Sequence, residues 1–242
     1  MRLLVTRPEH DSVVFKSQLV ALGHEVTVEP LLTISTANTE DVDLDGAQAL
    51  IATSRNGLRA LAEGPHIDAA KKLLLFAVGP GTAATARQLG FASIVEGPSN
   101  ARELVPIISE NADVNAGPVV HLQGDTVSPN FVDELHRLGF FVTQPIVYTT
   151  RVAERFASPT VASMRNKRID GVILLSPRTA EVYASLVEQH NLTDACKGIV
   201  HFCISQAAAS RLDALDGIPI KVPEKPNLQE MLALIGPAAA KS

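Results

Sequence analysis

The chain has 242 residues and a formal net charge of −5, with 46% hydrophobic, 19% charged and 4% aromatic residues. This composition is typical of a folded α/β protein, and the length suits two small domains better than one compact core. The acidic balance, the scarcity of aromatic residues and the dispersed Lys and Arg exclude the basic stripes and stacking platforms of nucleic-acid-binding proteins. We therefore expect no nucleic-acid partner.

Short apolar runs alternate with helical patterns along the chain. Residues 3–6 predict a buried strand, and residues 11–22 predict a helix that ends at Gly23, because glycine adopts the left-handed backbone most easily. Strands that alternate with helices predict parallel sheets flanked by helices. The further strand candidates are residues 49–53, 73–78, 93–95, 119–122, 172–175, 199–204 and 218–222.

Two segments, residues 25–35 and 141–152, break this alternation. Each is rich in β-branched residues and contains one proline, Pro30 in the first and Pro145 in the second. Both are longer than the typical strand of about five or six residues. We therefore expect two long strands that connect two lobes.

The sequence also repeats itself. Residues 3–33 return as residues 119–149, and residues 49–61 return as residues 172–184. Asn100 and Asn227 each precede a glutamate by three residues, a spacing typical of a capping box at a helix start. The repeat predicts an α/β fold of two similar parallel-sheet domains with a cleft between them.

Cys196 and Cys203 are the only cysteines, and their spacing fits neither a zinc site nor a redox motif. We interpret both as core residues, and because the seven histidines are scattered, we predict no metal site. The sequence contains no stretch of about 20 apolar residues, and Met1 leads into the first strand without the features of a signal peptide. We expect a cytoplasmic protein that does not enter a membrane.

Polar residues follow four of the predicted strands at their carboxyl ends, where parallel sheets bind ligands and helix N-termini present amide groups. Ser54 and Ser176 have the position of N-cap residues, and the turn of residues 79–82 opens a helix over residues 83–89. Hydroxyls, amides and cations together predict an anion receptor, although each cap would also serve a helix that binds nothing. The residues are Thr6, Arg7, Ser54, Arg55, Thr82, Ser176 and Arg178.

Other chemistry has weaker support. The turn of residues 79–82 matches neither the dinucleotide-binding pattern nor a P-loop, and no nucleophile elbow or Ser-His-Asp order is present. Tyr148 lies in the segment 141–152 and has two interpretations. It is either a strand residue packed at a sheet edge or a neutral proton donor that points into the cleft.

Five segments in order resemble the uroporphyrinogen-III synthase family: LLVTRP, ATSRNGLRAL, AVGPGTAATARQLGF, VYTT and LLSPRTAEVY. The resemblance implies two α/β domains joined by a two-stranded ladder. One domain would be discontinuous, with residues 1–34 and 152–242, and the other would span residues 35–151. The ladder would account for the two long segments.

The resemblance also implies a lyase of tetrapyrrole biosynthesis that leads to haem, sirohaem or cobalamin. Its substrate would be the linear tetrapyrrole hydroxymethylbilane, cyclised with loss of water and inversion of ring D through a spiro intermediate, and no cofactor is expected. Tyr148 would assist departure of the hydroxyl, and Ser54, Asn56, Thr82 and Ser176 would face the substrate. A monomer that makes a transient contact with the preceding pathway enzyme is also expected.

The chain departs from the family pattern at two turns. Where the family often has Arg-Gly and a later Gly-Arg, this chain has Gln123-Gly124-Asp125 and Ser128-Pro129, and Ala208 stands where the second glycine-rich turn usually has threonine. These departures motivate an alternative, a non-catalytic two-lobed module that binds a tetrapyrrole or another anion. Secreted sugar- or amino-acid-binding proteins share the two-lobe plan, but the missing signal peptide counts against them.

Overall fold

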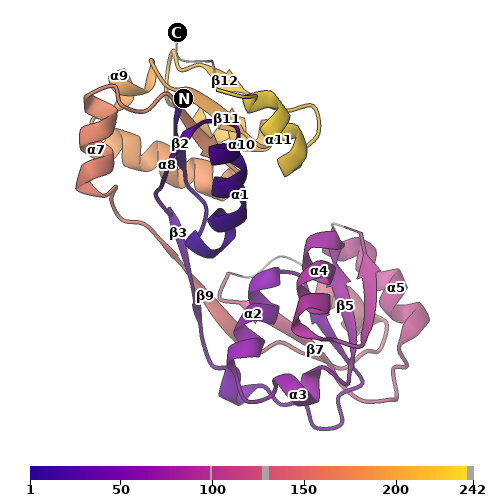
Figure 1. The fold of residues 1–242 in the computed structure, drawn as a ribbon. Helices are drawn as coiled ribbons and strands as arrows, with labels where there is room; N and C mark the ends of the chain where they lie inside the picture. The colour runs from indigo at the N-terminus through magenta and orange to yellow at the C-terminus, as the bar shows by residue number, and fades with distance from the viewer. Residues whose placement is uncertain (99, 127–130, 239–242) are drawn as a thin grey trace. The chain divides into compact units, whose positions relative to one another are not determined.

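A computed structural model describes residues 1–98, 100–126 and 131–238. The chain forms two compact units. Unit 1 comprises Met1–Thr33 and Arg151–Ser242, and unit 2 comprises Ile34–Thr150. The chain therefore leaves the first unit, builds the second and returns, as the colour sequence in Figure 1 shows.

Two neighbouring strands, β3 (Leu32–Thr36) and β9 (Ile146–Val152), carry the chain from one unit to the other. The Ala37 N–H donates to the Val147 carbonyl at 2.9 Å. At the other end of the pair, the Ala153 N–H donates to the Leu31 carbonyl at 3.0 Å. The order of these bonds shows that β3 and β9 run antiparallel.

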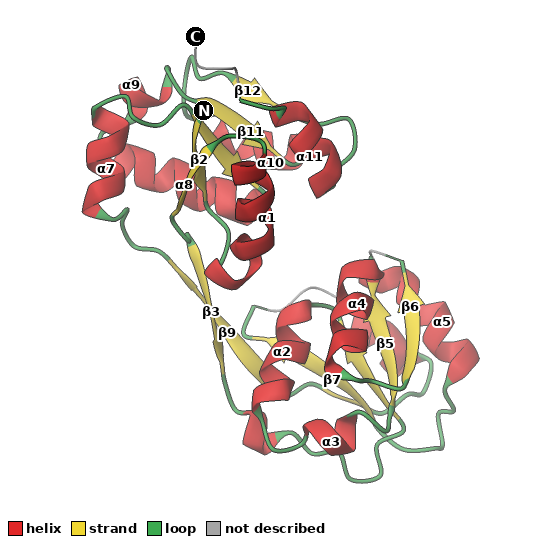
Figure 2. Ribbon diagram, viewed as in Figure 1, coloured by secondary structure: helices red, strands yellow, loops and turns green. Residues whose placement is uncertain are grey.

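Unit 1 contains a sheet in the order β12-β11-β10-β1-β2, and every neighbouring pair is parallel. Helices α7, α8, α9 and α10 pack on one face, and α1 and α11 on the other (Figure 2). The strands are β1 (Arg2–Val5), β2 (Glu25–Val28), β10 (Gly171–Leu174), β11 (Val200–Cys203) and β12 (Ile220–Lys221). The helices are α1 (Glu9–Ala21), α7 (Ser158–Arg165), α8 (Pro177–Gln189), α9 (Thr193–Cys196), α10 (Gln206–Ala209), the 3₁₀ turn η3 (Ser210–Leu212) and α11 (Leu228–Ile235).

Unit 2 contains a sheet in the order β3-β9-β7-β4-β5-β6, with β8 also paired to β7. Helices α2, α3 and α4 cover one face, and α5 and α6 cover the other. Its remaining strands are β4 (Ala49–Ala52), β5 (Leu74–Val78), β6 (Ser93–Gly97), β7 (Val119–Gly124) and β8 (Val142–Thr143). Its helices are α2 (Arg55–Glu63), α3 (Ile67–Ala70), α4 (Gly79–Leu89), α5 (Leu104–Asn111) and α6 (Phe131–Arg137), with 3₁₀ turns η1 (Thr39–Asp41) and η2 (Ala101–Glu103).

The central strands confirm the predicted class of parallel sheets flanked by helices. Every residue of β4, β7 and β10 is buried, because helices cover both faces of each sheet. The repeat also has a structural counterpart. The segments β1-α1-β2 and β7-α6-β8 are both strand-helix-strand units whose two strands pair in parallel.

The two long segments differ from the prediction. Each contains two strands, with a break at Pro30 between β2 and β3 and at Pro145 between β8 and β9, because proline has no N–H to donate to a ladder. The first strands, β2 and β8, join the sheets of their own units. Only β3 and β9 therefore connect the units.

Two helix starts also differ from the prediction. Helix α4 begins at Gly79, so Thr82 lies inside its first turn and not in a loop before it. Asn100 caps the short turn η2 by accepting from the Arg102 N–H, and α5 follows that turn. The capping box predicted at Asn227 is confirmed for the asparagine, because its side chain accepts from the Glu230 N–H at 2.9 Å.

A series of buried hydrogen bonds crosses the core of unit 1. The Tyr183 hydroxyl lies 3.0 Å from His201 Nε2 and 3.4 Å from Cys196 Sγ, and His201 Nδ1 lies 3.3 Å from the Pro219 carbonyl. Because that carbonyl accepts only, Nδ1 carries the proton and Nε2 accepts from Tyr183. Cys196 and Cys203 are both fully buried, which confirms them as core residues.

Replacing Tyr183 with phenylalanine should destabilise unit 1 by about 1–3 kcal/mol, because His201 Nε2 would be left buried without a donor. Urea unfolding at pH 7, followed by circular dichroism, measures this loss. An unchanged free energy of unfolding would contradict the assignment of the His201 proton to Nδ1 and of Nε2 as the acceptor from Tyr183.

Candidate functional site

Each sheet has one point at which the strand order reverses, and open parallel sheets bind ligands outside the carboxyl ends of strands at such points. In unit 1 the point lies between β1 and β10, and in unit 2 it lies between β4 and β7. A threonine hydroxyl links the two strands at each of them. Thr6 donates to the Ile173 carbonyl at 2.8 Å, and Thr53 lies 3.2 Å from His121 Nε2.

In unit 2, the turn after β4 brings three of the predicted residues to this edge. Ser54 caps α2 by accepting from the Asn56 N–H at 3.2 Å. The next residue, Arg55, reaches toward α4, where its Cδ lies 3.9 Å from the position of a Cβ on Gly81. The first turn of α2 also lies directly on β7, because a Cβ on Gly57 would be 3.2 Å from Leu122.

Thr82 lies in the first turn of α4, and α4 contacts α2. Its residue surface is only 6% exposed. Within residues 1–98, 100–126 and 131–238, no hydrogen bond is found for its hydroxyl. One turn further on, the Thr85 hydroxyl donates to the Gly81 carbonyl at 3.1 Å. Of these two threonines, Thr82 is thus the one whose hydroxyl has no hydrogen-bond partner among the described residues.

Tyr148 comes from β9, beside the carboxyl end of β7. Its residue pairs with Gly124, and its half-buried side chain packs against the core cluster formed under α2 and α4. Ser54, Arg55, Asn56, Thr82 and Tyr148 therefore belong to one edge and one face of the unit 2 sheet. This edge combines a phenol, a free hydroxyl, a guanidinium and two helix N-termini.

In unit 1, four predicted residues gather at the corresponding edge. Ser176 caps α8, since its hydroxyl accepts from the Thr179 N–H at 3.1 Å. Arg178 lies half-buried in the first turn of α8. Arg7 follows β1 and forms an ion pair with Asp11 at 3.5 Å, while Thr6 is fully buried and committed to its bond with Ile173. Thr6 therefore joins the end of β1 to β10 at this edge.

The residues that depart from the family pattern have structural roles. The side-chain carbonyl of Gln123 accepts from the Gln144 amide at 3.0 Å, so Gln123 ties β7 to the segment before β9. Ser205 still caps α10 by accepting from the Ala208 N–H at 3.3 Å, although the usual glycine and threonine are missing. Ser128 and Pro129 lie outside the described residues.

His121 was not among the predicted site residues. It lies on β7 at 4% exposure, and its Nδ1 has no hydrogen-bond partner within the described residues. Burial lowers its pKa to about 4, so the imidazole is neutral at pH 7. The signal for such a residue was a polar side chain inside the apolar run VVHL.

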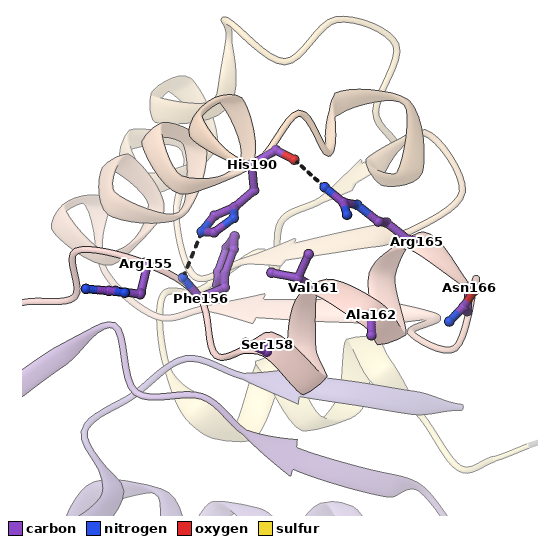
Figure 3. Close-up of a pocket in the computed structure, with 8 residues that line it drawn as sticks. All are labelled: Arg155, Phe156, Ser158, Val161, Ala162, Arg165, Asn166 and His190. Carbon is purple, nitrogen blue, oxygen red and sulfur yellow. Dashed lines mark hydrogen bonds between the residues drawn. The ribbon is translucent and has the colours of Figure 1, made fainter.

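Unit 1 also has a hollow of about 600 Å³ beside α7, and none of the predicted site residues lines it (Figure 3). His190 accepts from the Phe156 N–H at 3.2 Å, and Arg165 donates to the His190 carbonyl at 3.2 Å. The start of α7 is already occupied by the Glu29 carboxylate, which accepts from the Ala157 N–H at 2.7 Å. The polar groups here hold α7 in place.

In the described part of the chain, no helix has the length and apolar character needed to cross a bilayer. No group of three or more His, Cys, Asp or Glu side chains there could hold a metal ion.

Comparisons with known proteins extend this description. Two crystal structures are similar over nearly the whole chain: uroporphyrinogen-III synthetase from Helicobacter pylori and a mutant uroporphyrinogen III synthase from Thermus thermophilus. The first has 18% identity and a TM-score of 0.67, and the match covers 97% of this chain and 98% of the other. The second has 15% identity and a TM-score of 0.56, and covers 96% of each chain. A search of curated proteins found no match.

The fold therefore defines a class, the α/β proteins that share the fold of these solved synthases. A family model described as Uroporphyrinogen-III synthase HemD matches residues 13–233. The chain belongs to the uroporphyrinogen-III synthase family, whose members are enzymes of tetrapyrrole synthesis.

Proposed function

We propose that this protein is a lyase that cyclises hydroxymethylbilane to uroporphyrinogen III with inversion of ring D. The observation that carries the proposal is the edge of unit 2, where Tyr148 pairs with the end of β7 and packs against the core cluster to which α2 and α4 contribute. Membership of the family supports the substrate class.

The step of the reaction that needs a proton donor is the departure of the substrate hydroxyl. The hydroxyl of the terminal hydroxymethyl group leaves as water, balanced by the proton that the pyrrole N–H of the same ring loses, and an electrophilic azafulvene remains. The Tyr148 hydroxyl donates a hydrogen bond to that departing oxygen, which stabilises the charge that develops on it. The substituted α-carbon of ring D then attacks the methylene of the azafulvene and forms the spiro intermediate. The bond between that α-carbon and its original methylene bridge breaks, and the other α-carbon of ring D bonds to the released methylene and loses its proton, which closes the macrocycle with ring D reversed.

Orientation is the larger part of the task, because closure without an enzyme gives the unrearranged isomer. The protein must hold a flexible chain in one conformation and keep water from the azafulvene. Few catalytic side chains are needed for this. The proposed contribution of Ser54 and Asn56 is to hold the first turn of α2 in a defined position, through the cap that joins them.

The substrate carries eight carboxylates, and the net charge of the protein is −5. Binding therefore depends on local donors, which are the amide groups at helix starts together with Arg55, Thr82 and, in unit 1, Arg7, Ser176 and Arg178. We propose that these groups bind substrate carboxylates.

Replacing Thr82 with valine should raise KM about 10-fold, since a hydrogen bond to a charged group is worth about 1.5 kcal/mol or more. The change keeps the shape of the side chain and removes the unpartnered hydroxyl. Steady-state kinetics measure it, with Thr85→Val as the matched control on the same helix, because the Thr85 hydroxyl is bonded within the helix. Equal KM values in wild type and Thr82→Val would remove Thr82 from binding.

The test of the activity is an isomer assay. Hydroxymethylbilane is generated in place, the protein is added, and the oxidised products are separated by chromatography. The fraction of type III isomer in the product should rise with the enzyme concentration. If only type I forms, the proposal fails, and tight binding of the tetrapyrrole without turnover, measured by calorimetry, would then favour the non-catalytic module that Gln123 and Ala208 suggest.

A further inference from the structure

Tyr148 lies unusually close to the neighbouring strand. A Cβ built on Gly124 would be 2.6 Å from Tyr148 Cε2, 2.6 Å from Cζ and 2.9 Å from the hydroxyl oxygen. Carbon atoms normally approach to about 3.5–4.0 Å. The hydroxyl-bearing end of the ring therefore occupies space that any side chain at position 124 would need.

The backbone around Tyr148 is held on both sides. The Asp125 N–H donates to the Tyr148 carbonyl at 3.0 Å, and the Asp125 carboxylate accepts from the Thr150 N–H at 3.0 Å. On the opposite side, the Val147 carbonyl accepts from the N–H of Ala37, the residue that follows β3, at 2.9 Å. A clash at Gly124 would therefore move the tyrosine ring before it moved the strand.

An irregularity in the ladder also directs this side chain. The pairing steps from Gln123 opposite Ile146 to Gly124 opposite Tyr148, so Val147 is an extra residue in β9. Successive side chains of a regular strand point to opposite faces, yet Val147 and Tyr148 both pack against the same core cluster. A bulge of this kind re-aims a side chain.

We infer that Gly124 is a positioning residue, which sets the location of the Tyr148 hydroxyl because its lack of a side chain leaves room for the hydroxyl-bearing end of the ring. The inference rests on the proposed function for its effect on catalysis, but its geometry stands apart from that function. The backbone of Gly124 is outside the left-handed region, so an alanine there meets only the ring and no backbone strain. A ring displaced by about 1 Å should cost about 10²-fold in rate.

The geometry can be tested without any assay of activity, because Tyr148 and Tyr183 are the only tyrosines. Protein labelled with 3-fluorotyrosine should give two fluorine NMR resonances, and the resonance that is lost in Tyr148→Phe is that of Tyr148. Gly124→Ala should shift the Tyr148 resonance and leave that of Tyr183 unchanged. The control is Gly198→Ala, where the nearest atom to a new Cβ is 3.8 Å away. It should move neither.

An unshifted Tyr148 resonance in Gly124→Ala would overturn the inference. A variant that fails to fold would overturn it too, since the strand and not the ring would then have yielded. These outcomes are independent of the reaction, so they separate a failure of the geometry from a failure of the proposed function.

The kinetic arm uses a double-mutant cycle. Gly124→Ala should lower kcat about 10²-fold with KM changed less than about threefold, and should cost nothing further when Tyr148 is already phenylalanine. A full additional loss in the phenylalanine background would show that Gly124 acts on something other than Tyr148, and the positioning role would be rejected.

Discussion

Replacing Tyr148 with phenylalanine should lower kcat for type III formation by about 10²-fold, the lower range for loss of a positioned proton donor. The ring that packs against the α2 and α4 cluster is kept, so the free energy of unfolding should stay within about 0.5 kcal/mol of the wild type. The measurements are single-turnover kinetics at saturating substrate and urea unfolding of the same preparation.

The two tyrosines allow a crossed control. Tyr183 is buried in unit 1 and bonded to His201, whereas Tyr148 belongs to unit 2. Tyr183→Phe should lose stability and keep its rate below its unfolding transition, whereas Tyr148→Phe should lose rate and keep its stability. Equal kcat values for wild type and Tyr148→Phe would exclude the phenol from the reaction.

Acid should destabilise the protein well before its carboxylates are protonated. Burial lowers the pKa of both His121 and His201 to about 4, against an ordinary value of 6.5. The unfolded chain therefore binds more protons than the folded protein between pH 6.5 and 4, so stability falls as the pH falls through this window. Each histidine accounts for about 3 kcal/mol by pH 4, a large share of a typical folding free energy of about 5–15 kcal/mol.

Urea unfolding at pH 7 and pH 4.5 measures this loss, and histidine NMR titration identifies the groups. His121 is in unit 2 and His201 is in unit 1, so both units should weaken. In His121→Phe, only the unit 2 transition should lose its pH dependence. Equal stability at the two pH values, or imidazoles that titrate near pH 6.5, would show that these side chains are not held neutral in the folded state.

The parts of the site that sequence could predict are those set by local pattern. Ser54 and Ser176 cap their helices as expected, because an N-cap needs only a suitable side chain and a following helix. From the sequence, Gly124 is only part of a turn that departs from the family pattern. Its role depends on a ring 24 positions later in the sequence, which no local pattern reports.

The same distinction applies to the fold. Apolar runs that alternate with helical periodicity determined the α/β class, and the ordered motifs determined the family. The sequence alone did not decide which strands become neighbours, that Pro30 and Pro145 split two segments, or that His121 is sealed inside β7. Periodicity reports contacts between residues close in the chain. Strand order, register and burial instead arise from hydrogen bonds and packing between distant segments, which only the tertiary structure defines.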